Sequence, residues 1–170
     1  SEGTFNAAFV PSYSSELVKG KKKSNKFANE VFNLLFLILL LLVLMAQVFM
    51  PYFVSLIAPG FIDDNEKMNL AINLTRITFP FLFLVSLASF FSAILNSHNR
   101  FAEAAAAPII LNIVLITILI FSKVLNDNLI YYLSYGVTLS GLLQLLFLYF
   151  FVKKNFKLEF DFKLKITSKV

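Results

Sequence analysis

The sequence predicts an all-α fold, a polytopic bundle of transmembrane helices, from three observations. Hydrophobic residues make up 58% of the 170 residues, and the mean hydropathy is +0.77. A soluble domain is typically only about 45–50% apolar. The apolar residues form runs long enough to cross a bilayer, which takes about 20 residues. The basic residues gather at the ends of these runs, so we expect four complete membrane spans.

The first part, residues 1–26, is expected to hold the end of a truncated helix and then a basic cytoplasmic loop. Residues 4–18 are moderately apolar, contain Pro11, and are too few to cross a membrane. The segment 19–26 carries five lysines, which favours a solvated position beside the first span.

The first complete span is predicted at about residues 27–57. The stretch from Leu34 to Ala46 contains no polar residue, which is typical of a helix that faces lipid. An acidic loop, residues 58–68, follows a Pro59-Gly60 turn signal. Because it lacks the spacing of a calcium loop, we interpret it as solvated loop or helix cap.

The second span, at about residues 69–97, carries the main polar seam of the sequence. Ser86, Ser89 and Asn96 lie three and seven residues apart, which puts them on one helix face. Small polar side chains allow close approach of another helix. The same stripe would also suit the wall of a substrate cavity, and both interpretations stay open.

The third span, at about residues 103–121, contains Pro108 and Asn112. Pro108 cannot donate a backbone hydrogen bond, so the carbonyl one turn earlier is left free. Asn112 follows one turn later on the same face, and an amide inside a membrane is costly unless it is paired. We expect either an interhelical hydrogen bond or a polar contact in a transport cavity.

The fourth span is predicted at about residues 129–152. Tyrosines crowd its start, as in an interfacial aromatic belt. A second polar seam at helical spacing consists of Ser134, Thr138, Gly141 and Gln144. Among these residues, Gln144 is the candidate for a substrate-cavity or helix-packing contact.

The charges predict the orientation of the spans. Twelve of the 15 Lys and Arg residues fall in 19–26, 97–103 and the basic linker 153–170. The opposite side holds only Lys67 and two other basic residues. Under the positive-inside rule both ends of the chain are cytoplasmic. Within the linker, 158–166 alternates apolar with charged residues, which favours either a strand or an interfacial segment.

Composition excludes several classes of function. There is no cysteine and only one histidine, His98, so neither thiolate chemistry nor a multi-histidine metal site fits the chain. We expect no enzyme activity, no cofactor and no metal. We also expect no nucleic-acid partner, because no basic face interleaved with aromatics occurs in a soluble stretch. Transport or a structural membrane role remains.

Four blocks of the sequence resemble the MurJ (MviN) family of lipid II flippases. In chain order they read GTFNAAFVPSYSSEL, APGF, RITFPFLFLVSLASFFSAILNSHNRF and AAAAPIILNIVLI, and Gly141-Leu142-Leu143-Gln144-Leu145 extends the likeness. The resemblance covers nearly the whole chain.

The resemblance implies part of the N-terminal lobe of a multidrug/oligosaccharidyl-lipid/polysaccharide (MOP) exporter-type fold in the bacterial inner membrane. It implies lipid II, membrane lipids and the remaining helices of the same protein as partners. The implied activity is translocation of undecaprenyl-diphosphate-linked peptidoglycan precursor to the outer leaflet by alternating access. The alternatives are another MOP exporter, for polysaccharide-lipid or drugs, and a non-transporting membrane subunit.

Overall fold

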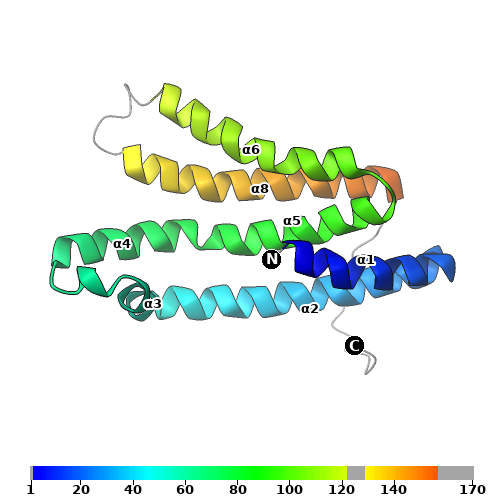
Figure 1. The fold of residues 1–170 in the computed structure, drawn as a ribbon, viewed down its shortest axis with the longest axis horizontal. Helices are drawn as coiled ribbons and strands as arrows, with labels where there is room; N and C mark the ends of the chain where they lie inside the picture. The colour runs from blue at the N-terminus through cyan, green and yellow to red at the C-terminus, as the bar shows by residue number, and fades with distance from the viewer. Residues whose placement is uncertain (1, 122–128, 157–170) are drawn as a thin grey trace.

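The structure is a computed structural model that describes residues 2–121 and 129–156, and its described part is a bundle of helices (Figure 1). The all-α prediction is confirmed. In chain order the elements are α1 (Glu2–Val18), α2 (Lys21–Val48), α3 (Met50–Ile57), the short 3-10 turn η1 (Pro59–Phe61), α4 (Asn65–Thr78), α5 (Pro80–Ser97), α6 (Phe101–Ile120) and α8 (Leu129–Phe156).

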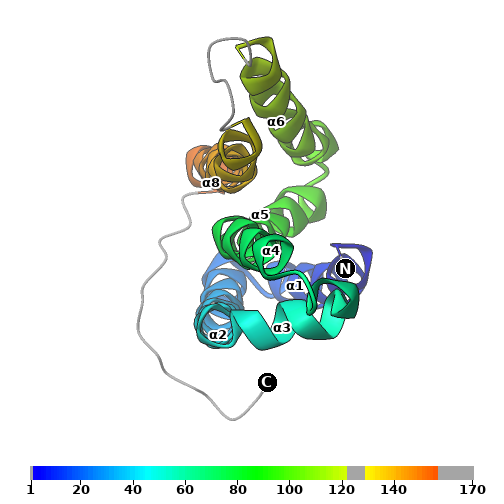
Figure 2. The ribbon, with the colours of Figure 1, turned by 90° about the vertical axis from the view of Figure 1, so that its left-hand side faces the viewer.

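Helix α5 runs through the middle of the bundle. Helices α6 and α8 lie on one side of it, and α1 and α2 lie on the other (Figures 1 and 2). Its second half is buried almost all round, and Phe90, Ile94 and Leu95 are each 0% exposed. Large apolar side chains on several faces of this half of α5 suit such a central position.

Aromatic rings fill the space between α5 and the two helices below it. Phe9 of α1 stacks on Tyr13 at 5.4 Å between ring centroids and lies 5.1 Å from Phe90. Phe32 of α2 lies 5.4 Å from Phe90 as well. Tilted and offset ring pairs at these distances add to the stabilisation that burial provides.

The first predicted span differs from the structure at both ends. The lysines of segment 19–26 lie mostly in the first turns of α2 rather than in a loop, because Gly20 with φ 117° makes the sharp turn from α1. Ser24 is fully buried there. At the other end, the segment predicted as one helix to residue 57 breaks at Phe49, and the separate helix α3 begins at Met50 with Pro51 in its first turn.

The second predicted span is broken at Phe79, between α4 and α5. Pro80 has no amide proton, so the Arg76 carbonyl loses its helical donor. The Gln47 side chain of α2 donates to that carbonyl with an Nε2–O distance of 2.9 Å. The Thr138 hydroxyl of α8 donates to the next carbonyl, that of Ile77. A side chain of α2 therefore satisfies the carbonyl that Pro80 frees, and a side chain of α8 bonds to the adjacent one.

Within the described residues, four helical segments are long and apolar enough to cross a membrane: Lys21–Val48, Asn65–Ser97, Phe101–Ile120 and Leu129–Phe156. The acidic loop ends in a helix cap, since Asp64 accepts a hydrogen bond from the Lys67 amide at 3.1 Å. Helix α8 continues to Phe156, four residues past the predicted end of the span. The alternating segment 158–166 and the loop 122–128 lie outside the described residues.

Candidate functional site

A groove with a volume of about 390 Å³ opens between α1, α5 and α6. It contains two of the six candidate residues that the sequence predicts, Asn96 and Pro108. Its lining residues are Asn6 from α1, Ser92 and Asn96 from α5, and Phe101, Ala104, Ala105 and Pro108 from α6.

The groove is mostly apolar, with three polar residues, Asn6, Ser92 and Asn96, and no charged residue in its lining. The Asn6 Oδ1 atom is buried and has no hydrogen-bond partner in the part of the chain that the structure describes. Pro108 lacks an amide proton, so the Ala104 carbonyl has no helical donor. Amides and a free carbonyl can bind hydroxyl or amide groups, but they cannot neutralise a phosphate.

The structure separates the three residues of the predicted α5 seam. Asn96 lines the groove, whereas Ser86 and Ser89 are half-buried elsewhere on α5. The Ser89 hydroxyl donates to the Val85 carbonyl of its own helix at 3.0 Å. A serine satisfied in this way needs no partner helix.

The remaining candidates lie on α6 and α8. Asn112 is exposed on the outer face of α6. Gln144 is 4% exposed, and its Nε2 has no hydrogen-bond partner among the described residues.

Close helix packing explains Gly141 in the second seam. A Cβ atom at Gly141 would lie 2.7 Å from a ring carbon of Phe81 and 3.2 Å from Cβ of Leu84, both in α5. Distances this short exclude a side chain, so the glycine allows α8 and α5 to approach closely.

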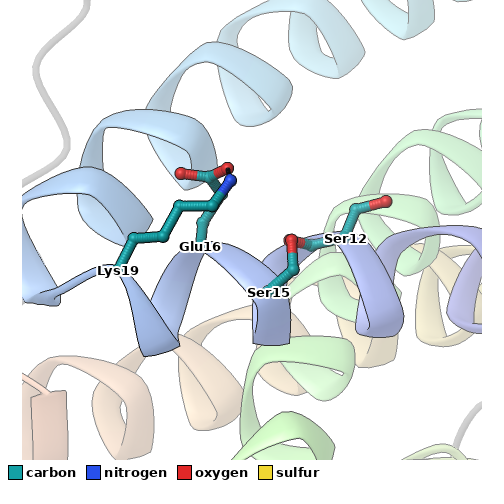
Figure 3. A network of polar contacts seen from close by, with 4 residues as sticks. All are labelled: Ser12, Ser15, Glu16 and Lys19. Atoms are coloured by element: carbon teal, nitrogen blue, oxygen red, sulfur yellow. Dashed lines mark hydrogen bonds and ion pairs between the residues drawn. The ribbon is translucent and has the colours of Figure 1, made fainter.

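Sequence analysis missed the exposed face of α1. Its residues are small or polar and lie at helical spacing: Ala7, Ala8, Pro11, Ser12 and Ser15. Figure 3 shows the polar end of this face, where the Ser15 hydroxyl donates to the Ser12 carbonyl at 2.8 Å and Lys19 pairs with Glu16 at 2.6 Å. The spacing is visible in the sequence, and the helix continues through Pro11.

The exposed face of α2 is apolar, in contrast to that of α1. Its exposed residues in the apolar stretch are Leu34, Ile38, Leu41, Leu42, Leu44 and Met45. Large aliphatic side chains suit lipid, which agrees with the prediction that this stretch faces the bilayer.

His98, in the turn between α5 and α6, joins three parts of the bundle. Its Nε2 lies 3.4 Å from the Tyr13 hydroxyl of α1, and its ring stacks on Phe156 of α8 at 3.9 Å between centroids. Burial lowers the pKa of His98 below its ordinary value of 6.5, and the nearby charges of Lys21 and Arg100 lower it further. The neutral ring therefore has a structural role at this end of the bundle.

The described residues contain four helices that can cross a membrane, and the outer faces of the bundle are aliphatic on α2 and small or polar on α1. These features define a polytopic integral membrane protein. Residues 1–169 match the family described as lipid II flippase MurJ, and the chain belongs to that family. It is accordingly a multi-pass protein of the bacterial inner membrane.

Several relatives carry the name "Probable lipid II flippase MurJ". The one from Rickettsia prowazekii (strain Madrid E) is 39% identical over 154 residues, which covers 90% of this chain and 30% of the relative. The one from Rhizobium tropici is 40% identical over 89% of this chain and 30% of its own length. The one from Helicobacter pylori (strain J99) is 33% identical over 99% of this chain and 36% of its own length. The chain thus spans about three tenths of the first two relatives.

Proposed function

We propose that these residues form part of the N-terminal lobe of a lipid II flippase, which moves the undecaprenyl-diphosphate-linked peptidoglycan precursor to the outer leaflet. Family membership supports the activity. One observation supports the role proposed for this chain. The outer face of α1 has small and polar side chains, whereas the outer face of α2 has large aliphatic ones.

A headgroup with a diphosphate cannot cross hydrocarbon unaided, because burial of an unpaired charge costs many kcal/mol. A flippase therefore needs a hydrated path beside its lipid-facing wall. The exposed face of α1, with Ser12 and Ser15, supplies such a wall. Small side chains leave room for water and for sugar hydroxyls, and serine oxygens remain free to accept further hydrogen bonds.

The cations that bind the diphosphate come from other parts of the full-length protein. Arg100 precedes α6 and is already paired with Glu103 at 2.7 Å. Arg76, in the last turn of α4, is the one basic residue of the described membrane-capable segments that lies away from their ends. A single guanidinium cannot balance the charge of a diphosphate. Transport by alternating access also needs a second bundle that moves against this one. No covalent step is involved, so the protein is a transporter and not an enzyme.

The six candidate residues divide among three roles in this proposal. Asn96, Pro108 and Gln144 act in helix packing, because Asn96 and Pro108 line an interhelical groove and Gln144 is buried inside the bundle. Ser86 and Ser89 are half-buried on α5, where the Ser89 hydroxyl bonds to its own helix. Asn112, exposed on α6, is the candidate for a polar contact with the substrate or with a further helix.

Cysteine accessibility in the full-length protein tests the proposed path, since residues 1–170 contain no cysteine. Ser12→Cys and Ser15→Cys should react with a small hydrophilic thiol reagent, whereas Leu41→Cys and Leu42→Cys should not. Equal protection of all four positions would place α1 against lipid or protein and remove it from the path.

Complementation tests the activity itself. In cells depleted of their own flippase, the full-length protein should restore growth and exposure of lipid II on the outer leaflet, and residues 1–170 alone should not. Failure of the full-length protein, with correct insertion in the membrane, would favour a different exporter of the superfamily or a non-transporting subunit.

A further inference from the structure

Helix α3 runs across the direction of the spans, at the end of the bundle opposite the lysines of α2. Figure 1 shows α3 almost end-on beside spans that run lengthwise, and Figure 2 shows it lengthwise where α2 is seen end-on. It packs on α4, and its buried residues are Met50 and Val54, one turn apart. The helix is therefore not the end of a span, although the sequence predicted it there.

The face of α3 that the bundle leaves uncovered is strongly apolar. Tyr52 is 74% exposed, Leu56 80% and Ile57 79%. The helix reads MPYFVSLI and has no charged residue, and the Ser55 hydroxyl donates to the Tyr52 carbonyl within the helix at 2.9 Å. Exposure of apolar surface to water costs about 25 cal/mol per Å². A helix that is apolar on nearly every face needs a cover other than water.

The length of α2 places α3 at the level of a membrane surface. From Lys26, the last lysine of its first turns, to its end at Val48, α2 measures about 33 Å at 1.5 Å per residue. The hydrocarbon core of a bilayer is about 30 Å thick. With Lys26 at one headgroup layer, Val48 reaches the other layer, and α3 follows directly from there.

Arg76 of α4 marks the same level from a second helix. Gln47, in the last turn of α2, donates to the Arg76 carbonyl, so the two residues lie at one height. The Arg76 side chain is exposed, and a guanidinium is costly in the middle of a bilayer but can bind lipid phosphates at its surface. The exposed residues of α4 before it include Glu66, Asn69 and Asn73, which suit water. Helix α4 thus extends beyond the end of α2, as Figure 1 shows, and α3 lies at the surface.

We propose that α3 is an interfacial helix, embedded among the upper acyl chains of the leaflet that the positive-inside rule makes the outer one. Its exposed face follows the aliphatic outer face of α2 along the chain, through the exposed Met45, Val48 and Phe49. The partner of this surface is therefore the same lipid that covers α2. Since α3 has no polar face, it lies just below the headgroups. This inference does not rest on the proposed transport activity.

Tryptophan fluorescence of the full-length protein tests the position of α3, because residues 1–170 contain no tryptophan. Any tryptophans elsewhere in the protein are replaced by phenylalanine. Leu56→Trp reports on α3, and Tyr52→Trp is a second variant that keeps an aromatic ring. Ile38→Trp, on the exposed face in the middle of α2, and Asn69→Trp, on the exposed face of α4, are the controls.

Each variant is placed in vesicles of phosphatidylcholine and phosphatidylglycerol that carry a nitroxide either high on the acyl chain or near its end. Interfacial helices lie about 5–10 Å into the boundary of headgroups and acyl chains, whereas the chain ends meet about 15 Å from the surface. The high nitroxide should therefore quench both α3 variants at least about twofold more than the deep one. Ile38→Trp should show the reverse order. Aqueous iodide should quench Asn69→Trp, and neither lipid should.

The other outcomes overturn the inference. Quenching of both α3 variants by iodide alone would show that this face lies in water. Protection from iodide and from both lipids would show that protein covers α3, either more of the same chain or a second copy. Stronger quenching by the deep nitroxide would make α3 part of a span. Unchanged helical circular dichroism of each variant confirms that the comparison concerns the folded protein.

Discussion

The hydrogen bonds at the Pro80 break give the sharpest prediction on stability. Pro80 separates α4 from α5, and Thr138 of α8 donates its hydroxyl proton to the Ile77 carbonyl beside the break. Thr138→Val keeps the shape of the side chain but removes the donor. The partly buried carbonyl then loses its donor from α8, and the bond between α8 and the α4–α5 segment is lost.

The expected cost follows from measurements on such bonds. An interhelical hydrogen bond in a membrane protein contributes about 0.6 kcal/mol on average and at most about 1.7 kcal/mol. Because the lost bond is partly buried and joins two helices beside a proline, we expect Thr138→Val to cost about 1–1.7 kcal/mol. Gln47→Leu should cost less, about 0.5 kcal/mol, because its bond to the Arg76 carbonyl is exposed and water can replace it.

The assay is equilibrium unfolding of the purified full-length protein in mixed micelles. Thr117→Val is the matched control, since the exposed Thr117 hydroxyl donates only to the Ile113 carbonyl of its own helix at 2.7 Å. Pro80→Ala restores the missing amide proton, so Gln47→Leu should have no further effect in that background. Equal unfolding free energies for the Thr138 and Thr117 variants would refute the reasoning.

Three other predictions test the packing, the buried histidine and the topology. Gly141→Ala should cost about 1–3 kcal/mol of unfolding free energy, because the new methyl would meet a ring carbon at 2.7 Å, whereas Gly60→Ala, with nothing within 4 Å, should be neutral. Because the pKa of His98 is lowered in the folded protein, the unfolded chain binds a proton at higher pH than the folded one. Thermal stability should therefore fall as the pH drops below about 6.5, and His98→Gln should abolish that fall. A pH profile of stability that the substitution leaves unchanged would contradict this prediction. Asn65→Cys and Lys23→Cys, both at exposed positions, should label from opposite sides of the membrane, and labelling of both from outside intact cells would overturn the orientation.

The candidate site residues remain a prediction, and the structure places them at several different positions in the bundle. Ser86, Ser89 and Asn96 lie on one stripe of a helix. The helix that packs on each part of this stripe depends on where the neighbouring helices cross it. Only Asn96 lies where α1 and α6 diverge from α5 and leave a groove. Asn6 joins it there from a segment 90 positions earlier in the chain, which no local pattern can indicate.

The sequence by itself determined the fold class and the approximate places of the membrane spans. In a bilayer each helix must satisfy its own backbone and present apolar side chains, so a local hydropathy pattern suffices to reveal it. The tertiary structure alone decided how Pro80 is accommodated, because the freed Arg76 carbonyl takes a donor from Gln47 and the adjacent Ile77 carbonyl takes one from Thr138, both on other helices. It also decided which outer faces are polar, since the exposure of Ser12 or Leu41 depends on the helices that pack against the opposite side. These are long-range contacts, and their geometry exists only once the bundle has assembled.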